Sequence, residues 1–322
     1  MDMNERPHPA SPSRAAMYHN LFHTALILLS MGLLFGALGW MIFGVIGLIL
    51  SVMMAVLVLA STPKLNPPMI LKMYGARPLS FREAPGMYSV VSELSRRAGL
   101  KNAPVLYYVP SRVMNAFSLG SKENSAIALS DRLIRFLSFR EMAGVLAHEM
   151  SHISNNDLRL HALADMMTRI TSLLSFIGQL LILLYLPVLF FSNERIPVFF
   201  IALLIFAPTV SMLLQLALSR NREFVADATA VSLTGDPEGL ASALAKMDTY
   251  EKRFWEVLVL PGKKAPDPSA LRTHPKTRER IRRIMLLEPG QGPPFPDLDP
   301  GPPGRFSDMR GAPPWNWFQP WR

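Results

Sequence analysis

His148, Glu149 and His152 have the residue types and the spacing that metal-dependent hydrolysis requires. They form an H-E-x-x-H run on a segment that reads as a helix, where residues i and i+4 share one face. Both imidazoles can therefore bind one zinc ion. Glu149 points about 100° away from His148, where it can take a proton from a zinc-bound water. The run predicts one Zn²⁺ per chain and hydrolysis of peptide bonds.

The residues around this run place it on a helix. Ser138 and Glu141 have the spacing of a capping box, which predicts that a helix begins just before the run. Apolar residues continue beside it at helical spacing, namely Met142, Val145, Leu146 and Ile153. Five residues can match by chance, and a lone histidine on a helix is more often structural than a ligand. This context favours the metal site.

Uncharged stretches before and after the run predict an integral membrane protein. Residues 21–61 contain no Asp, Glu, Lys or Arg, and as one helix they would be about 60 Å long, twice the thickness of the hydrocarbon core. We therefore expect two helices with a turn near Gly36–Gly39. Ile170–Phe191 and Ile196–Leu218 are a second uncharged pair. The pattern predicts two transmembrane hairpins.

The distribution of charge predicts the orientation in the membrane. Arg6 and Arg14 precede the first span, whereas Glu194 and Arg195 are the charges of the second outer turn. Basic residues also follow the second span, at Lys64, Lys72, Arg77 and Arg82. The positive-inside rule then places both termini and the H-E-x-x-H run in the cytoplasm, for a bacterial inner-membrane protein whose first helix is an uncleaved anchor. The net charge of +9 fits this orientation, and no nucleic-acid motif accompanies it.

The fold class that follows is α+β and mainly helical, with a small sheet in a cytoplasmic domain that is split by the second hairpin. We predict strands at Val105–Val109, Met114–Leu119 and Ser125–Leu129. The predicted division is a polar segment at 1–20, hairpins at 21–61 and 170–218, the two parts of the catalytic domain at 62–169 and 219–288, and a tail at 289–322. The tail holds ten of the 28 prolines and three of the five tryptophans, so it is either disordered or in contact with the membrane interface.

A catalytic zinc usually has a third protein ligand, which here must be His or a carboxylate because the chain has no cysteine. We expect the helix to carry Asp157 and Asp165 away from the two rings, and Glu194 lies in the outer turn. Glu223 comes five residues after the last span, so the hairpin returns it to the H-E-x-x-H helix, although a surface acid is the alternative. Asp227 shares its face and is expected to accept a hydrogen bond from a ligand histidine.

Several of these segments together resemble the HtpX-type membrane-bound zinc endopeptidases. The resemblance rests on His148–His152 continued by Asn156 and Asp157, and on Ser219–Asp227, in which the family has its third zinc ligand at Glu223. It extends to Asn115-Ala116-Phe117, the edge strand above the cleft, and to His274-Pro275 with Arg278 and Arg280. Over residues 20–290 it implies a gluzincin-like domain that cuts unfolded or damaged membrane proteins in quality control.

Two further roles are expected in peptide hydrolysis. His274 is the candidate donor to the oxyanion, or else a turn residue before Pro275. Residues 113–119 are expected to bind an extended substrate by strand addition, with Phe117 lining a pocket or belonging to the core. His161 is expected to be an ordinary juxtamembrane residue.

Three other classes of protein compete with this interpretation. An intramembrane protease would have its H-E-x-x-H run inside an apolar span, whereas charged residues surround this one. A CAAX-type prenyl-protein protease would have more than four membrane helices. A catalytically inactive scaffold would not need Glu149, and a transporter would place ionisable residues within its spans.

Overall fold

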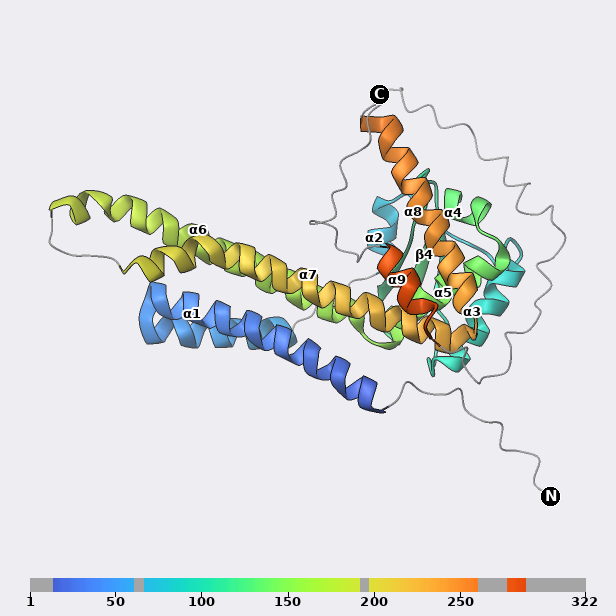
Figure 1. Cartoon of the computed structure of the whole chain (residues 1–322), viewed down its shortest axis with the longest axis horizontal. Coiled ribbons are helices and arrows are strands. Elements are labelled where there is room, and N and C mark those ends of the chain that lie inside the picture. The colour runs from blue at the N-terminus through green and yellow to red at the C-terminus, as the bar shows by residue number, and fades with distance from the viewer. Residues whose placement is uncertain (1–13, 61–66, 192–196, 260–276, 288–322) are drawn as a thin grey trace, which may run out of the picture.

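The computed structural model describes residues 14–60, 67–191, 197–259 and 277–287. A long helical bundle continues into a domain of helices and a small sheet (Figure 1). The predicted Pro/Trp-rich tail and most of the predicted N-terminal polar segment lie outside the described residues.

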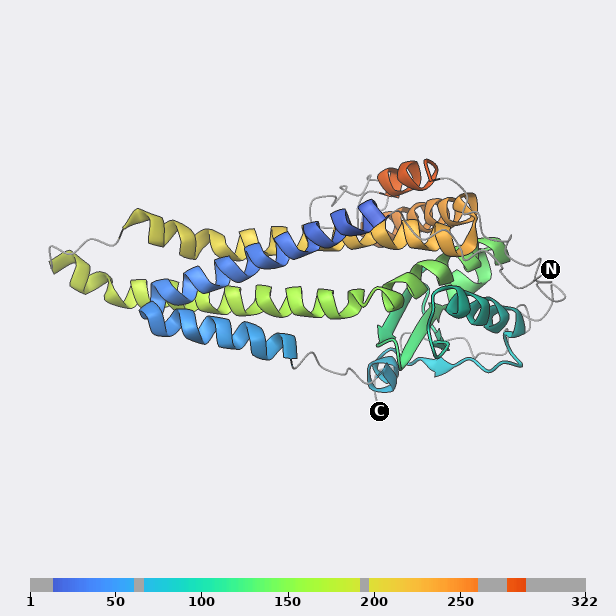
Figure 2. The ribbon, with the colours of Figure 1, turned by 90° about the horizontal axis from the view of Figure 1, so that it is seen from below.

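Helix α1 (Arg14–Ala60) is broken at Gly44, whose φ of 60° and ψ of −145° are not helical. Its two arms run antiparallel, as Figure 2 shows. A Cβ atom on Gly39 would meet the carbonyl oxygen of Gly47 at 2.5 Å, so the arms approach more closely than side chains would allow. The turn predicted near Gly36–Gly39 was therefore wrong. Gly44 makes the turn, and Gly39 makes the close contact.

The second hairpin consists of α6 (Asp157–Phe191) and α7 (Val198–Thr234), which lie side by side in both views (Figures 1 and 2). Pro208 of α7 has no N–H to donate to the carbonyl oxygen of Leu204, one turn earlier. Gln179 Nε2 of α6 donates to that oxygen instead, at 2.9 Å, and so does the Ser175 hydroxyl. Among the described residues, α1, α6 and α7 are long and apolar enough to cross a membrane.

The sheet has four strands in the order β1-β2-β4-β3: β1 (Arg77–Pro78), β2 (Val105–Val109), β4 (Ser125–Ser130) and β3 (Ala116–Gly120). Strands β2 and β4 are parallel, and the other two pairs are antiparallel. The three predicted strands are confirmed, although β3 begins two residues later than expected. Because β3 ends the sheet, one of its edges is not paired with another strand of the described residues.

Helices enclose the sheet and form the core of this domain. Helix α2 (Pro67–Met73) packs on one face through Leu71, whereas α3 (Pro85–Arg97) and α5 (Phe139–Ser154) pack in the main core. Helices α4 (Asp131–Phe136), α8 (Pro237–Val259) and α9 (Thr277–Ile284) complete it. A Cβ atom on Gly144 of α5 would lie 3.0 Å from the Cα atom of Leu240, so this glycine lets α8 lie close to α5.

The H-E-x-x-H run lies on α5, and the predicted capping box is present. The Glu141 N–H donates to Ser138 Oγ at 3.3 Å, and the Ser138 N–H donates to Glu141 Oε2 at 2.8 Å. Ser242 and Lys246 of α8 also donate to the Glu141 carboxylate, at 2.6 and 2.8 Å. One carboxylate thus caps α5 and joins it to α8.

Candidate metal centre

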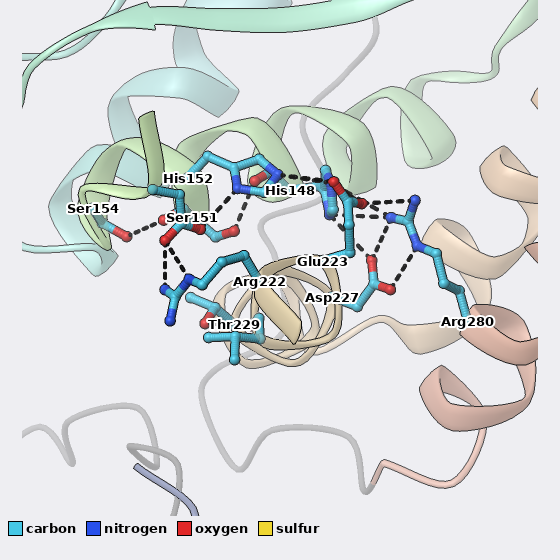
Figure 3. Close-up of polar contacts among 11 residues, drawn as sticks. His148, Ser151, His152, Ser154, Arg222, Glu223, Asp227, Thr229 and Arg280 are labelled. Carbon is cyan, nitrogen blue, oxygen red and sulfur yellow. Dashed lines mark hydrogen bonds and ion pairs between the residues drawn. The ribbon is translucent and has the colours of Figure 1, made fainter. Parts of the chain in front are cut away.

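The structure brings His148, His152 and Glu223 together, although 71 residues separate the second histidine from the glutamate. The two Nε2 atoms are 3.2 Å apart. The Glu223 carboxylate lies 3.5 Å from the Nε2 atom of His148 and 3.8 Å from that of His152. Figure 3 shows the rings on α5 turned toward Glu223 on α7. One nitrogen or oxygen atom from each residue lies within 4.8 Å of the others, so the group could hold a metal ion.

An acid contacts the other nitrogen of each ring. Asp227 Oδ1 lies 3.1 Å from His148 Nδ1, as the shared face of α7 predicted. Asp157 Oδ2 lies 2.9 Å from His152 Nδ1. If each Nδ1–H is donated to its acid, a bound metal ion could take the Nε2 atom of each ring.

The prediction that Asp157 is carried away from the rings was wrong. It assumed that the helix continues to residue 156, but α5 ends at Ser154 and Asn156 has a φ of 57°. The chain turns at residues 155–156, and α6 begins at Asp157. The left-handed position accepts asparagine more readily than most residues, so the Asn155-Asn156 pair was the sequence signal for this bend. Asp165 lies eight residues after Asp157 on α6, and it lines the same cleft as the histidines.

Two buried arginines hold these acids. Arg222 Nε of α7 donates to Asp157 Oδ1 at 2.6 Å. Arg280 of α9 donates to both oxygens of Asp227, at 2.8 and 2.7 Å, and its Nη1 lies 2.9 Å from Glu223 Oε2. Sequence reasoning assigned no site role to either arginine. Both arginine side chains are buried. A buried charge without a partner of opposite sign is costly, so each arginine pairs with an acid.

The charges of the site act on one another strongly. Burial lowers the pKa of His148, but its hydrogen bonds with Asp227 and Glu223 outweigh burial and raise that pKa to about 10. Burial likewise opposes the charge of Arg280, yet Asp227, Glu223 and Glu149 raise the pKa of its guanidinium above the usual range. A metal ion that binds His148 would displace its proton, and with both histidines neutral four carboxylates (Glu149, Asp157, Glu223 and Asp227) face two arginines. The excess of two negative charges suits a divalent cation.

The group lies in a cleft of about 890 Å³ that α5, α6, α7, α8, α9 and β3 all line. Glu149 lines this cleft and is 8% exposed. The predicted substrate residues Asn115, Ala116 and Phe117 line it too. His161, expected to be an ordinary juxtamembrane residue, also lies in its wall. The candidate oxyanion donor His274 lies outside the described residues.

The chain is similar to several known proteins. Residues 82–287 match the model of "Peptidase family M48". The chain is 31% identical to "Protease HtpX homolog" of Campylobacter concisus (strain 13826), over 83% of this chain and 97% of that protein. It is 33% identical to the homologue of Acaryochloris marina (strain MBIC 11017), over 84% and 95%. A solved structure, "Crystal Structure of S. mikatae Ste24p", aligns with a TM-score of 0.43 and 18% identity, over 86% of this chain and 68% of that one.

A His-His-Glu group at the base of long apolar helices, in a chain with these relatives, defines a membrane-bound metalloprotease. The chain belongs to peptidase family M48, and the resemblance to its HtpX-type proteases is confirmed.

Proposed function

We propose that the protein is a zinc-dependent endopeptidase that cuts unfolded or damaged membrane proteins on the cytoplasmic side of the membrane, in protein quality control. The observation that carries this proposal is the convergence of two imidazole nitrogens and one carboxylate beside a buried glutamate. His148, His152 and Glu223 are the proposed ligands, Glu149 is the proposed base, and Asp227 positions His148.

The spacing of the three donors fits zinc. Two ligands at about 2.0–2.1 Å from one tetrahedral ion lie about 3.3 Å apart, and the two Nε2 atoms are 3.2 Å apart. The Glu223 oxygens, at 3.5 and 3.8 Å, need only a small adjustment. Imidazole and carboxylate ligands together are typical of catalytic zinc.

In the proposed mechanism the protein supplies the base and the alignment. A bound zinc ion supplies Lewis acidity toward the scissile carbonyl and the attacking water. Glu149 accepts the proton of that water and delivers it to the leaving amine. Arg280 is a positioning residue, because its guanidinium holds Asp227 and Glu223 in register with His148. His274 stays the proposed donor to the oxyanion.

Strand β3 is proposed to bind the substrate through its backbone. The Ser130 N–H of β4 donates to the carbonyl oxygen of Asn115 at 3.0 Å. Backbone groups alternate in direction along an antiparallel strand, so Ala116 and Ser118 turn theirs toward the outer edge of the sheet. An extended chain beside Asn115-Ala116-Phe117 would add one strand, which favours unfolded substrates and little sequence preference.

The membrane arrangement is part of the proposal. The two arms of α1 with α6 and α7 would form the two hairpins, 21–61 and 170–218, with both termini and the catalytic parts 62–169 and 219–288 in the cytoplasm. The support is the basic residues beside the spans, at Lys64, Lys72, Arg77 and Arg82. The segments 1–20 and 289–322 would lie outside the catalytic domain.

Metal analysis tests the proposed site directly. The detergent-purified protein is stripped with a chelator, reloaded with zinc and analysed for metal content and for cleavage of an unfolded protein. We expect one zinc per chain, and activity that returns with it. Glu223→Gln should lose both metal and activity, whereas Glu123→Gln, at an exposed position between β3 and β4, should keep both. Equal zinc content in the two variants would contradict the proposed ligand set. Cleavage of a prenylated peptide in preference to the unfolded protein would instead favour a prenyl-protein protease.

A further inference from the structure

The cleft extends in two directions from His148, His152 and Glu223. One part, between α5 and α8, is apolar and lined by Val145, Leu240, Leu244 and Met247. The other part, which we name the membrane-side arm, lies between α6 and α7. It is lined by His161, Ala162 and Asp165 of α6 and by Gln215, Leu216 and Ser219 of α7. This arm runs along the α6–α7 hairpin, away from the core that surrounds the sheet.

The membrane-side arm ends where the uncharged spans begin. On α6, Arg169 is the last charged residue before the span, one turn beyond Asp165. On α7, the predicted span ends at Leu218, so Gln215 lies about one turn inside it. Glu223 and Gln215 are eight residues apart on one helix, which corresponds to about 12 Å. The arm therefore joins the candidate metal centre to the boundary of the hydrocarbon core.

The lining of the arm suits a peptide backbone rather than a lipid chain. An extended chain that leaves the bilayer must find partners for its N–H and C=O groups, because hydrocarbon offers none. Gln215, Ser219 and His161 provide side chains that both donate and accept hydrogen bonds. Asp165 adds an acceptor whose side chain is 47% exposed while it pairs with Arg169. Leu216 and Ala162 leave room for apolar side chains.

We propose that the membrane-side arm binds the juxtamembrane stretch of a substrate that is itself embedded in the bilayer. The distance from the arm's end to the metal centre then sets the position of the cut. At about 3.3 Å per residue, 12 Å corresponds to about four residues. Cleavage should fall about four residues from the substrate residue that lies beside Gln215, at the membrane end of the arm. This inference rests on the proposed function and specifies its substrate.

A series of membrane-anchored reporters tests this position. Each reporter carries one transmembrane helix and the same unstructured chain, attached through spacers of 0, about 10 or about 20 residues and in either chain direction. The zinc-loaded protein and the reporters are placed together in liposomes, and the cut sites are identified by mass spectrometry. The free unstructured chain, without a helix, is the reference.

The cut sites separate the two proposals. In at least one chain direction, we expect cleavage to stay close to the membrane boundary and to move into the spacer as it lengthens. Cuts that stay at the same sequence positions as in the free chain, whatever the spacer, would overturn the membrane-side arm while leaving the protease intact. If wild-type protein cuts neither the free nor the anchored chain, the proposed function itself fails, and this inference fails with it.

A matched pair of substitutions on α6 provides a second test. Ala162→Phe places a ring in the arm, whereas Met166→Phe adds a ring at an exposed position one turn along that does not line the cleft. We expect Ala162→Phe to lower the ratio of anchored to free cleavage at least about tenfold, and Met166→Phe to leave the ratio unchanged. An unchanged ratio in Ala162→Phe protein with a normal unfolding transition would contradict the proposal. If the Ala162→Phe protein does not fold, the spacer series alone tests whether the membrane-side arm binds the substrate.

Discussion

Each histidine of the candidate centre is held by an acid, and each acid by an arginine. His152, Asp157 and Arg222 form one such chain, and His148, Asp227 and Arg280 form the other. Partners of this kind fix the orientation of a ligand ring and increase its basicity. The two chains come from α5, α6, α7 and α9, so the geometry of the centre depends on four helices.

Replacement of Asp157 should weaken metal binding without removing a ligand. We expect Asp157→Asn to lower the zinc affinity about 10–100-fold, the usual cost of losing such a partner. Chelator-competition titration measures it, with Asp131→Asn on α4 as the matched control. When the Asp157→Asn protein is fully loaded with zinc, its cleavage rate should fall much less, relative to wild type, than its zinc affinity falls. An unchanged affinity would show that His152 is held in place by its packing alone.

Arg280 should stabilise the metal-free protein because it compensates two buried carboxylates. Removing one partner of a buried ion pair typically costs about 3–5 kcal/mol, so Arg280→Met should lower the thermal unfolding midpoint clearly. Asp227→Asn removes one of the acids that Arg280 compensates. The double variant should therefore lose less than the sum of the two single losses. Strict additivity would mean that the guanidinium and Asp227 act independently.

The sequence predicted the residues of this centre unevenly. His148, Glu149 and His152 follow from one local run, and Glu223 follows from the topology of a hairpin that returns to the same face. Asp157 was misplaced because the bend at Asn156 depends on the end of α5. Arg280 lies 57 residues from Glu223 on a separate short helix. No local sequence pattern predicts which face of α7 such a helix packs against.

At the scale of helices, the H-E-x-x-H helix is fixed at its N-terminus and along one face. Glu141 closes the capping box and binds Ser242 and Lys246 of α8. Burial raises the pKa of this carboxyl, but Lys246, Ser242 and the Ser138 N–H outweigh burial and lower it to about 2. Its folded pKa therefore lies below its unfolded value of about 4.3.

This shift predicts an acid-dependent contribution of Glu141 to stability. A lowered folded pKa stabilises the fold above the unfolded pKa, and the contribution disappears as the pH falls from about 4.3 to about 2. We expect Glu141→Gln to reduce the free energy of unfolding by about 1–2 kcal/mol at pH 7, discounted for the exposed Lys246 partner. The difference from wild type should shrink below pH 4. Unfolding at a series of pH values measures it, and a constant difference would contradict the assignment.

Gly144 should be required for the contact between α5 and α8. A Cβ atom there would lie 3.0 Å from the Leu240 Cα atom, which is backbone and cannot rotate away. Gly144→Val should push α8 away from α5, lower the unfolding midpoint and reduce cleavage, since Leu240 and Leu244 line the cleft. Ala245→Val on the exposed side of α8 is the control. Wild-type cleavage and stability in Gly144→Val protein would refute this role.

Secondary structure was more predictable than the turns that join it. The strands β2, β3 and β4 were all predicted, and the capping box identified the start of α5. The turn of α1 was misplaced because several glycines are available between residues 32 and 47, and hydropathy does not distinguish them. Only the folded structure shows that residue 44 adopts a positive φ and that residue 39 must lack a side chain for the two arms to pack.

At the scale of the whole molecule, the helical bundle and the domain that contains the sheet share two helices. Helix α7 runs without interruption from its apolar span to Glu223 and Asp227, and α6 begins at Asp157, which contacts His152. Residues 221–233 form the last part of α7, which ends at Thr234. This continuity explains how a chain divided by a hairpin builds one centre, and why the cleft extends toward the apolar spans.

Cleavage by the wild type and by Glu149→Gln, side by side, tests the central claim most directly. Both proteins are purified in detergent, loaded with zinc and given the same unfolded protein. We predict that both bind one zinc per chain and that the variant loses about 10²–10⁴-fold in rate, the usual contribution of a general base. Equal rates in the two zinc-loaded proteins would contradict the assignment of Glu149 and the mechanism built on it.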